Sequence, residues 1–370
     1  MKVLVIPTWY TEKSKPMAEG IFHFEQSSEL NKFCDVRLYF PFDREVSVFS
    51  EGEENGLYTY RSPVRKNKII QVLDAVKGFE KIYKSFKPDI IHSHVAFGAG
   101  IIAVLIGKKY NIPVVDTEHN PIEFMSLESK LHWKLDDYVY SHTKANICVS
   151  KDSQEKLSSH FPNRTFGLIY NGVIDPKSIE KNEDRYRIDN AINFAITAAF
   201  YDKEVKGYQY LLPAIKDVLE SDPDIYLHIC GGGTYFEYYK SMAGELGIAD
   251  HCIFYGQCNR EKVYSVMSQM DFCISTSLFE CSGVSVEEAM LLGRPMLVTR
   301  SGGANSLCTD DTAIIVDSGS ATAIRDGIRQ MISRLNSFSP DSIREYAFEN
   351  FEITNTSKKY YELFQSILGE

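Results

Sequence analysis

The sequence predicts an α/β protein built from two doubly wound, Rossmann-like domains that face a cleft. Short apolar stretches alternate with amphipathic ones along almost all of the 370 residues, which is typical of parallel sheets with crossover helices. This alternation restarts after a segment of turn residues and charges near the middle of the chain. With 44% hydrophobic residues, the chain can bury two cores of ordinary size.

The first domain is predicted to span residues 1–175. Its opening strand is followed by a loop and then by an amphipathic helix from Gly20 to Phe33. Its strands are expected at Val3–Ile6, Val36–Phe40, Ile90–His94, Val114–Thr117, Ile147–Ser150 and Phe166–Tyr170.

The second domain is predicted to span residues 190–350, after a linker that begins at Asn171 and continues through charged residues to Asn190. Its strands are expected at Phe194–Phe200, Tyr226–Gly231, Cys252–Tyr255, Phe272–Thr276, Met296–Thr299 and Ala313–Val316. A last helix from Ile353 to Leu368 places four large residues on one apolar side: Tyr360, Tyr361, Phe364 and Ile367.

Composition excludes several classes of protein. The net charge of −10 argues against a nucleic-acid partner. No stretch approaches the ~18 unbroken apolar residues of a membrane span. The eight cysteines include no CxxC pair, which favours reduced thiols over a disulfide framework. We therefore expect a cytoplasmic protein.

Two glutamates mark the most informative part of the chain. Glu280 follows a predicted strand, and Glu288 lies one to two turns inside the helix that comes next. Both can face the crevice at the carboxyl ends of the strands, where open α/β sheets bind ligands. Ionised carboxylates accept several hydrogen bonds and suit the paired hydroxyls of a sugar. The alternative is a capping box formed by Ser285 and Glu288, with Glu280 merely solvated.

A possible phosphate site follows the first strand of the second domain. Lys206 precedes Gly207 at the start of a predicted helix, where backbone amides favour anions. Gly231 opens a glycine triplet at the end of the next strand, where a ligand could approach the backbone closely. A solvated lysine in an ordinary loop is the alternative.

Histidines gather at strand ends of the first domain. His92 and His94 share one face of a strand, so a metal site completed by Glu118 or His119 is conceivable. No third histidine or cysteine has a fixed ligand spacing to either pair, and we expect no metal ion. His119 is the better candidate for contact with a substrate, and a core-edge histidine is the alternative.

Together these motifs resemble glycosyltransferase family 4, the retaining, metal-independent glycosyl transferases of group 1 with the GT-B fold. The resemblance extends over nearly the whole chain and is strongest from Ile169 to Gly303. Its marks are the Glu280–Glu288 spacing, the run from Glu288 to Pro295, Gly302-Gly303, Asn171-Gly172-Val173, Lys206-Gly207, Asp89–His94 and Thr117-Glu118-His119.

The resemblance implies that a nucleotide-diphosphate sugar, UDP- or GDP-linked, is the donor substrate and that no other cofactor is needed. Glu288 would hold the ribose hydroxyls and Glu280 the transferred sugar. Lys206 would neutralise the departing diphosphate. The amides of three further residues would line the sugar and diphosphate: Ser282, Gly283 and Val284.

The resemblance also assigns roles in the first domain. His119 would lie near the sugar and acceptor, and Gly20 would lie close to the phosphates. Residues 351–370 would form a C-terminal helix that returns toward the first domain. The chain departs from the family at Phe200, where an arginine is usual, and at Cys281-Ser282, where Gly-Phe is usual.

The predicted function is transfer of a sugar from the nucleotide sugar to a glycan or lipid-linked acceptor, in cell-surface polysaccharide or glycoconjugate synthesis. A nucleotide-sugar epimerase of the same fold and a non-catalytic nucleotide-sugar-binding protein are the alternatives. The Glu280–Glu288 run disfavours the epimerase, and Phe200 and Cys281 are the features that support the binding protein.

One segment bears on the acceptor. Residues 61–87 contain eight basic residues and the acids Asp74 and Glu80. Such a surface could attract an anionic membrane and make the enzyme peripheral at its inner face. The solvated outer face of a crossover helix is an equally good explanation.

Overall fold

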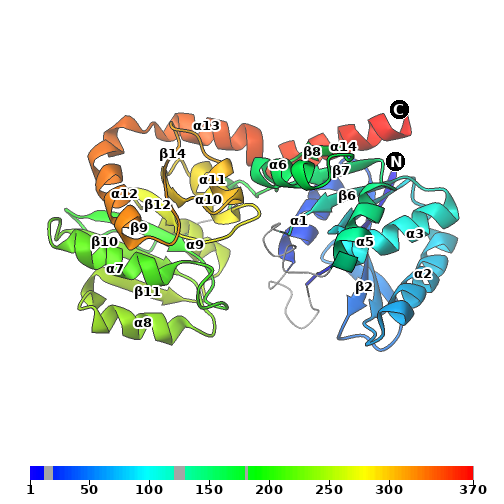
Figure 1. Ribbon diagram of the computed structural model, residues 1–370, viewed down its shortest axis with the longest axis horizontal. Coiled ribbons are helices and arrows are strands. Elements are labelled where there is room, and N and C mark those ends of the chain that lie inside the picture. The colour runs from blue at the N-terminus through cyan, green and yellow to red at the C-terminus, as the bar shows by residue number, and fades with distance from the viewer. Residues whose placement is uncertain (12–19, 121–129, 180–181, 370) are drawn as a thin grey trace. The chain divides into compact units, whose positions relative to one another are not determined.

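The computed structural model describes residues 1–11, 20–120, 130–179 and 182–369 (Figure 1). The chain divides into two compact units. One comprises Met1–Gly172 with Ile353–Glu370, and the other comprises Val173–Glu352. Each unit contains its own sheet, as the sequence predicted for a protein of two doubly wound domains.

The first unit holds an eight-stranded sheet within the described residues, in the order β3-β4-β2-β1-β5-β6-β7-β8. All neighbouring strands are parallel except β3 and β4. The strands are β1 (Lys2–Pro7), β2 (Asp35–Asp43), β3 (Ser50–Glu54), β4 (Leu57–Pro63), β5 (Ile90–His94), β6 (Val114–Glu118), β7 (Ala145–Cys148) and β8 (Phe166–Leu168). The helical segments are α1 (Ile21–Leu30), α2 (Lys68–Ser85), η1 (Ala96–Gly100), α3 (Ile101–Tyr110), α5 (Lys130–Tyr140), α6 (Lys151–His160) and α14 (Ile353–Leu368).

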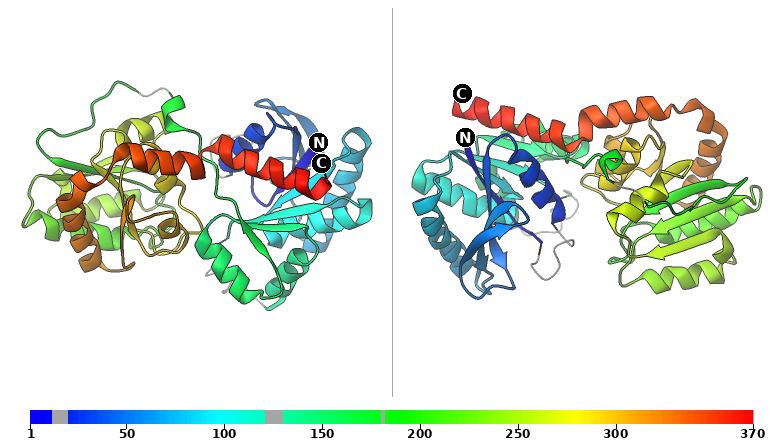
Figure 2. Two further views of the ribbon diagram at one scale, coloured as in Figure 1. Left: turned by 90° about the horizontal axis from the view of Figure 1, so that it is seen from above. Right: turned by 180° about the vertical axis from the view of Figure 1, so that it is seen from behind.

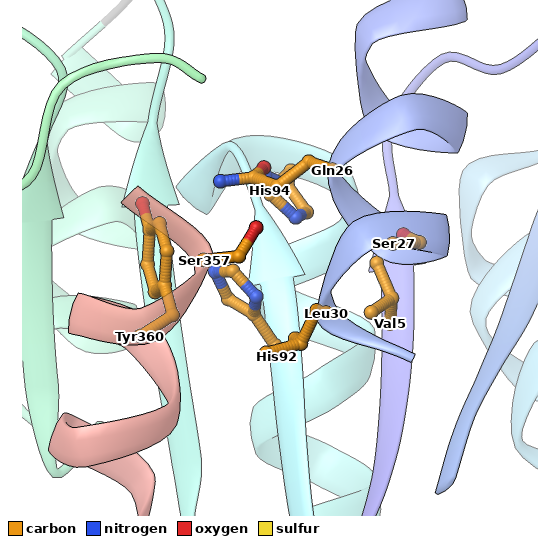
Figure 3. A pocket seen from close by; sticks show the side chains of 8 residues that line it. All are labelled: Val5, Gln26, Ser27, Leu30, His92, His94, Ser357 and Tyr360. Atoms are coloured by element: carbon orange, nitrogen blue, oxygen red, sulfur yellow. The ribbon is translucent and has the colours of Figure 1, made fainter. Parts of the chain in front are cut away.

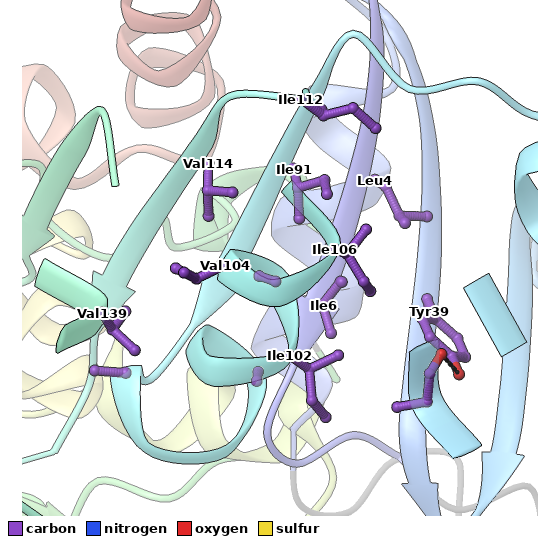
Figure 4. Close-up of a cluster of buried hydrophobic side chains, with 14 of the residues drawn as sticks. Leu4, Ile6, Tyr39, Ile91, Ile102, Val104, Ile106, Ile112, Val114 and Val139 are labelled. Carbon is purple, nitrogen blue, oxygen red and sulfur yellow. Dashed lines mark hydrogen bonds between the residues drawn. The ribbon is translucent and has the colours of Figure 1, made fainter. Parts of the chain in front are cut away.

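Alternating side chains of β1 enter two different cores, because successive residues of a strand point to opposite faces. Leu4 and Ile6 pack with residues of α2 and α3, a core shown in Figure 4. Val3 and Val5 pack on the other face, where Tyr360 and Phe364 of α14 are fully buried. The last helix thus belongs to the first unit and lies beside α1 (Figure 2).

An antiparallel hairpin at the edge of this sheet was not among the predicted elements. Asn55 and Gly56 connect β3 to β4, and both have positive φ, as a tight two-residue hairpin turn requires. The dipeptide Asn55-Gly56 is typical of such a turn and could have predicted it.

The second unit holds a six-stranded parallel sheet among the described residues, in the order β11-β10-β9-β12-β13-β14. Counted along the chain this is 3-2-1-4-5-6, the order of dinucleotide-binding folds. The strands are β9 (Ile192–Thr197), β10 (Ile225–Cys230), β11 (Cys252–Gly256), β12 (Phe272–Ser275), β13 (Met296–Thr299) and β14 (Ala313–Val316). The helical segments are η2 (Pro176–Ser178), α7 (Tyr208–Leu219), α8 (Phe236–Glu245), η3 (Ala249–His251), α9 (Arg260–Met267), α10 (Val284–Leu291), α11 (Gly303–Ser306), α12 (Ala321–Arg334), η4 (Leu335–Ser337) and α13 (Pro340–Phe351).

The segment expected to link the domains is attached to the second unit. The backbone amides of Asn182 and Tyr186 donate to Ser265 Oγ and Gln269 Oε1, each over 2.9 Å. Asp175 forms an ion pair with Arg344 of α13, with 2.8 Å between Oδ2 and Nη2. These contacts hold Asp175, Asn182 and Tyr186 on the second unit.

The eight cysteines are all free thiols, as expected, and Cys148, Cys230 and Cys273 are buried in strands. Of the helices that the structure describes, none has the length and apolarity to cross a bilayer.

Candidate active site

The switch point of the second sheet lies between β9 and β12, which are neighbours although the chain places two strands between them. Connections leave these two strands in opposite directions, and this opens a crevice at their carboxyl ends. The loop after β9 carries Lys206, and the loop after β12 carries Glu280. The topology therefore brings two of the predicted site residues to one place.

Lys206 and Glu280 form an ion pair, with 2.5 Å between Nζ and Oε1. Ser277 Oγ donates to the same carboxylate oxygen over 2.7 Å. The side chains of Lys206 and Glu280 are 29% and 23% exposed, so both remain accessible from solvent. A cation and an anion are thus held together at the edge where ligands bind in such sheets.

Two loops are joined by direct hydrogen bonds around this pair. Leu278 N donates to Val205 O, and Thr276 Oγ1 donates to Lys206 O, each over 2.8 Å. Gly207 has a φ of +71°, and a Cβ atom there would lie 1.9 Å from the Thr276 carbonyl oxygen. Glycine at this position permits the close approach of the loops, a structural reason that the sequence could not reveal.

Helix α10 begins directly beyond Glu280 and has Gly283 as its N-cap residue, without a side-chain cap. The Ser285–Glu288 capping box considered above is therefore wrong. Glu288 lies inside the helix and half-buried, and its Oε1 accepts a 2.8 Å hydrogen bond from the hydroxyl of Tyr264 in α9. The segment Ser282–Val284 forms the entry to α10, where the first amides of a helix are left for other acceptors.

Glu287 was not among the site residues predicted from the sequence. It is fully buried, and its Oε1 accepts a 3.0 Å hydrogen bond from Ser282 Oγ, whereas Oε2 has no partner among the described residues. Burial, reinforced by the charge of Glu288, raises the pKa of Glu287 to about 8, although the Ser282 bond lowers it. Glu287 thus anchors the loop that the resemblance assigns to the sugar and diphosphate.

The glycine triplet has a packing explanation. A Cβ atom on Gly231 would lie 2.0 Å from the Ala198 carbonyl oxygen, and one on Gly233 would lie 2.7 Å from the Phe200 carbonyl carbon. The chain that approaches these glycines is therefore the loop after β9. Contact of Gly231 with a ligand stays a prediction.

Phe200, at the position of the usual arginine, is fully buried in an aromatic cluster. Its ring stacks on Tyr208 with centroids 4.3 Å apart and lies 5.8 Å from Tyr239. Lys203 does not replace the missing charge beside Lys206, because its Nζ lies 4.6 Å over the ring of Tyr238.

In the first unit, the switch point lies between β1 and β5. His94 ends β5, His119 follows β6, and His23 lies in α1, and the three rings meet at this edge. His94 Nδ1 is 2.8 Å from His119 Nε2. Burial lowers the pKa of all three imidazoles. Val95, directly after His94, has a φ of +77°, which is strained for a β-branched residue and is found where surrounding contacts enforce it.

His92 shares the face of His94, as predicted, and Figure 3 shows both beside Ser357 and Tyr360 of α14. Its Nε2 lies 2.8 Å from Thr117 Oγ1. Glu118 is fully engaged, because its carboxylate accepts from Tyr140 and from three backbone amides. Neither residue therefore joins His94 and His119 as a free ligand.

Gly20 is the N-cap of α1, with a φ of +82°. A Cβ atom there would lie 2.8 Å from Tyr10 Cα, which explains the need for glycine. The predicted proximity of Gly20 to phosphates stays a prediction.

Comparison with known proteins gives two family models, one for each half of the chain. A family model described as glycosyl transferases group 1 matches residues 178–349, and one described as glycosyltransferase family 4 matches residues 24–175. An uncharacterized glycosyltransferase of Methanocaldococcus jannaschii is 26% identical over 340 residues, covering 90% of this chain and 89% of the relative.

Two further comparisons add a relative and a solved structure. The alpha-monoglucosyldiacylglycerol synthase of Streptococcus pneumoniae is 24% identical over 257 residues, covering 64% of this chain and 58% of the synthase. The structure of Anabaena HepE in complex with UDP has a TM-score of 0.77 and 16% identity, covering 99% of this chain and 100% of HepE. The chain belongs to the glycosyl transferases group 1 family, and its two Rossmann-like sheets are those of the GT-B fold.

Proposed function

We propose that this glycosyltransferase moves a sugar from a nucleotide-diphosphate sugar to a glycan or lipid-linked acceptor, with retention of anomeric configuration. The observation that carries the proposal is the Lys206–Glu280 ion pair at the switch point of the second sheet, beside the first turn of α10. A cation, a carboxylate and helix amides at one sheet edge match the diphosphate and the hydroxyls of such a donor.

In this proposal each side chain has a separate task. Glu288, already positioned by Tyr264, accepts hydrogen bonds from the ribose hydroxyls. Glu280 accepts from the transferred sugar. Lys206 leaves its pairing with Glu280, or shares it, to neutralise the diphosphate together with the amides of Ser282, Gly283 and Val284.

The reaction breaks the bond between the anomeric carbon and a phosphate oxygen while a bond to an acceptor hydroxyl forms. Negative charge grows on the departing diphosphate, and the sugar acquires oxocarbenium character. Fixed positive groups lower this barrier because they stabilise charge that is larger in the transition state than in the ground state. The acceptor attacks from the side the diphosphate leaves, and the leaving phosphate takes the hydroxyl proton.

The surface of α2 and its flanking residues supports a lipid-linked acceptor. Arg61 contributes no surface charge, since it is 1% exposed and paired with Asp43 and Glu54. The other basic residues of the segment are exposed: Arg65, Lys66, Lys68, Lys77, Lys81, Lys84 and Lys87. Beside them, Ile69 and Leu73 are 73% and 55% exposed. Apolar side chains amid lysines fit the surface of an anionic membrane, where a lipid-linked acceptor would be met.

A ligand screen tests whether the protein binds a nucleotide of the proposed donor and which base that nucleotide carries. Melting of the full chain is recorded with UDP, GDP, ADP and CDP. One of them is expected to raise the melting temperature in proportion to the logarithm of its concentration, because ligand that binds the folded state stabilises it. The absence of a shift with all four, and with the corresponding glucose and mannose derivatives, would refute the proposed donor site.

A further inference from the structure

The structure gathers three histidines that the sequence keeps far apart. One ligand nitrogen from each of His23, His94 and His119 lies within 4.8 Å of the other two. They come from α1, from the end of β5 and from the residue after β6. They therefore meet at the carboxyl edge of the first sheet, beside its switch point.

His23 carries the strongest sign of a missing partner. It is fully buried, and within the described part of the chain neither of its ring nitrogens has a hydrogen-bond partner. A neutral imidazole always has one N–H donor and one lone pair, and leaving such groups buried and unpaired is unfavourable. Apart from histidines, the rings around it are Phe22 and Trp9, with centroids 3.9 and 5.8 Å away, and neither is hydrogen-bonded to the His23 nitrogens.

The spacing suits a metal ion. Zinc binds imidazole nitrogens at about 2.0–2.1 Å in a tetrahedron, which separates the ligand atoms by roughly 3.3 Å. His94 Nδ1 and His119 Nε2 are 2.8 Å apart and share a proton. Replacing that N–H by an ion needs these two nitrogens to separate by roughly half an ångström. The His23 nitrogen, which lies within 4.8 Å of both, would have to approach them.

We propose that His23, His94 and His119 bind a divalent transition-metal ion, with zinc as the probe, through three imidazole nitrogens. Imidazole ligands favour zinc, copper, nickel and iron over magnesium or calcium. Three protein ligands leave a fourth position open to water or an oxygen ligand. The ion would fix α1 to the ends of β5 and β6.

This proposal reverses the expectation of no metal ion that was drawn from the sequence. His23 lies well upstream of the two strand ends, so no ligand spacing could have indicated it. His119, which the resemblance places near the sugar and acceptor, would hold the ion in this proposal, whereas the donor-binding candidates Lys206, Glu280 and Glu288 lie in the second unit. The test below measures metal binding and not turnover, so its outcome is separate from that of the proposed function.

The experiment uses the full chain freed of metal with a chelator and then dialysed. Titration with Co²⁺ is expected to reach one equivalent and to give the visible bands of a four-coordinate site without thiolate charge transfer. Zn²⁺ is expected to displace Co²⁺ and to raise the melting temperature. Failure of either ion to bind stoichiometrically would overturn the proposal.

The variant His23→Phe keeps a planar aromatic ring, one atom larger than imidazole, and removes both unpaired nitrogens. Its zinc affinity is expected to fall at least about 100-fold, since loss of a ligand exceeds the effect of losing an outer partner. Without metal it should melt at or above the temperature of the metal-free wild type. His119→Gln, a change at a half-buried loop position, is the second ligand variant if His23→Phe does not fold.

His142→Ala is the matched control, because it removes an exposed imidazole of the same unit. It should bind one equivalent of zinc with unchanged affinity. Retention of wild-type zinc affinity in His23→Phe or His119→Gln would assign the ion to another part of the chain and would contradict the proposal.

Discussion

The carboxyl group of Glu287 is held in a place that opposes its ionisation. It is fully buried beside Glu288, with Ser282 as its hydrogen-bond donor, and its pKa rises from 4.5 to about 8. The folded protein therefore binds this proton more tightly than the unfolded chain. The resulting destabilisation is absent below pH 4.5, grows as the pH rises to about 8, and is constant above.

Replacement Glu287→Gln removes this pH dependence. The variant is expected to gain stability relative to the wild type as the pH rises from 5 to 8, by a total on the order of 3–5 kcal/mol. Urea unfolding at pH 5, 6.5 and 8 measures the difference. Glu349→Gln, at an exposed position of the same unit, should show no such trend. A constant difference at all three pH values would mean that Glu287 is ionised throughout.

Lys206 is expected to act on the leaving group. Lys206→Ala should lower donor turnover by about 10²–10³, because it removes one fixed positive group facing the developing charge. The melting temperature should change little, since the side chain is partly exposed and its partner Glu280 keeps the Ser277 hydrogen bond. Release of free sugar from the donor in the absence of acceptor is the measurement.

Lys203→Ala is the matched control from the same loop, where the lysine lies over Tyr238. It should retain nearly full turnover. Equal losses in the two variants would show that the loop as a whole is needed, and an unchanged Lys206→Ala would exclude the assigned role.

At this scale the sequence predicted residues whose type and spacing form a motif. Lys206 and Glu280 were selected separately, and the structure joins them in one ion pair. Glu287 and His23 were not found. Glu287 stands beside a motif glutamate without a signal of burial. Three of the rings around His23, those of Trp9, His94 and His119, belong to residues distant in the chain.

Helix α2 presents a surface that is both apolar and basic. Its own unit leaves Ile69 and Leu73 exposed on this surface. Its start is well defined, because Asn67 Oδ1 accepts from the amides of Ile69 and Ile70. Several lysines lie along the same helix: Lys68, Lys77, Lys81 and Lys84. These exposed side chains are the ones that the proposed docking to a membrane would bury.

The double variant Ile69→Ser, Leu73→Ser is expected to bind anionic vesicles about tenfold or more weakly than the wild type, because each apolar side chain would otherwise be buried at the interface. Co-sedimentation with vesicles of anionic and of neutral lipid measures the partitioning. Phe348→Ser, which removes an exposed aromatic residue of α13, is the control. Equal partitioning of the wild type onto both kinds of vesicle would contradict membrane docking.

Element by element, the sequence predicted parallel strands well because each is a short apolar run between turn signals. The last helix has the predicted bounds, Ile353 to Leu368. The strand β3 was missed because Ser50–Glu54 is polar on both faces, as an edge strand can be. The strand β4, which is mostly buried and parallel to β2, was missed as well. The periodicity of a sequence does not show which strands pair with each other. The two switch points could therefore be located only in the structure.

At the scale of the molecule, the two sheets have different chemistry at their carboxyl edges. The second unit offers a lysine, carboxylates and helix amides, and the first offers imidazoles. In the proposed mechanism the donor site manages the diphosphate without magnesium. Turnover of the enzyme, with its other bound ions left in place, is expected to be the same with and without added magnesium. A requirement for magnesium would assign the leaving-group charge to that ion.

Glu288 and its neighbours are proposed to hold a nucleoside diphosphate on the second unit. Calorimetric titration with the nucleotide selected by melting, and with its 2′,3′-dideoxy analogue, tests this claim. For the wild type, loss of the ribose hydroxyls should weaken binding about ten- to a hundredfold, as expected for hydrogen bonds to a charged group. For Glu288→Gln, the two ligands should bind with affinities much closer to each other. An undiminished difference between the ligands in the variant would rule out contact of Glu288 with the ribose hydroxyls, and no binding by the wild type would rule out the donor site.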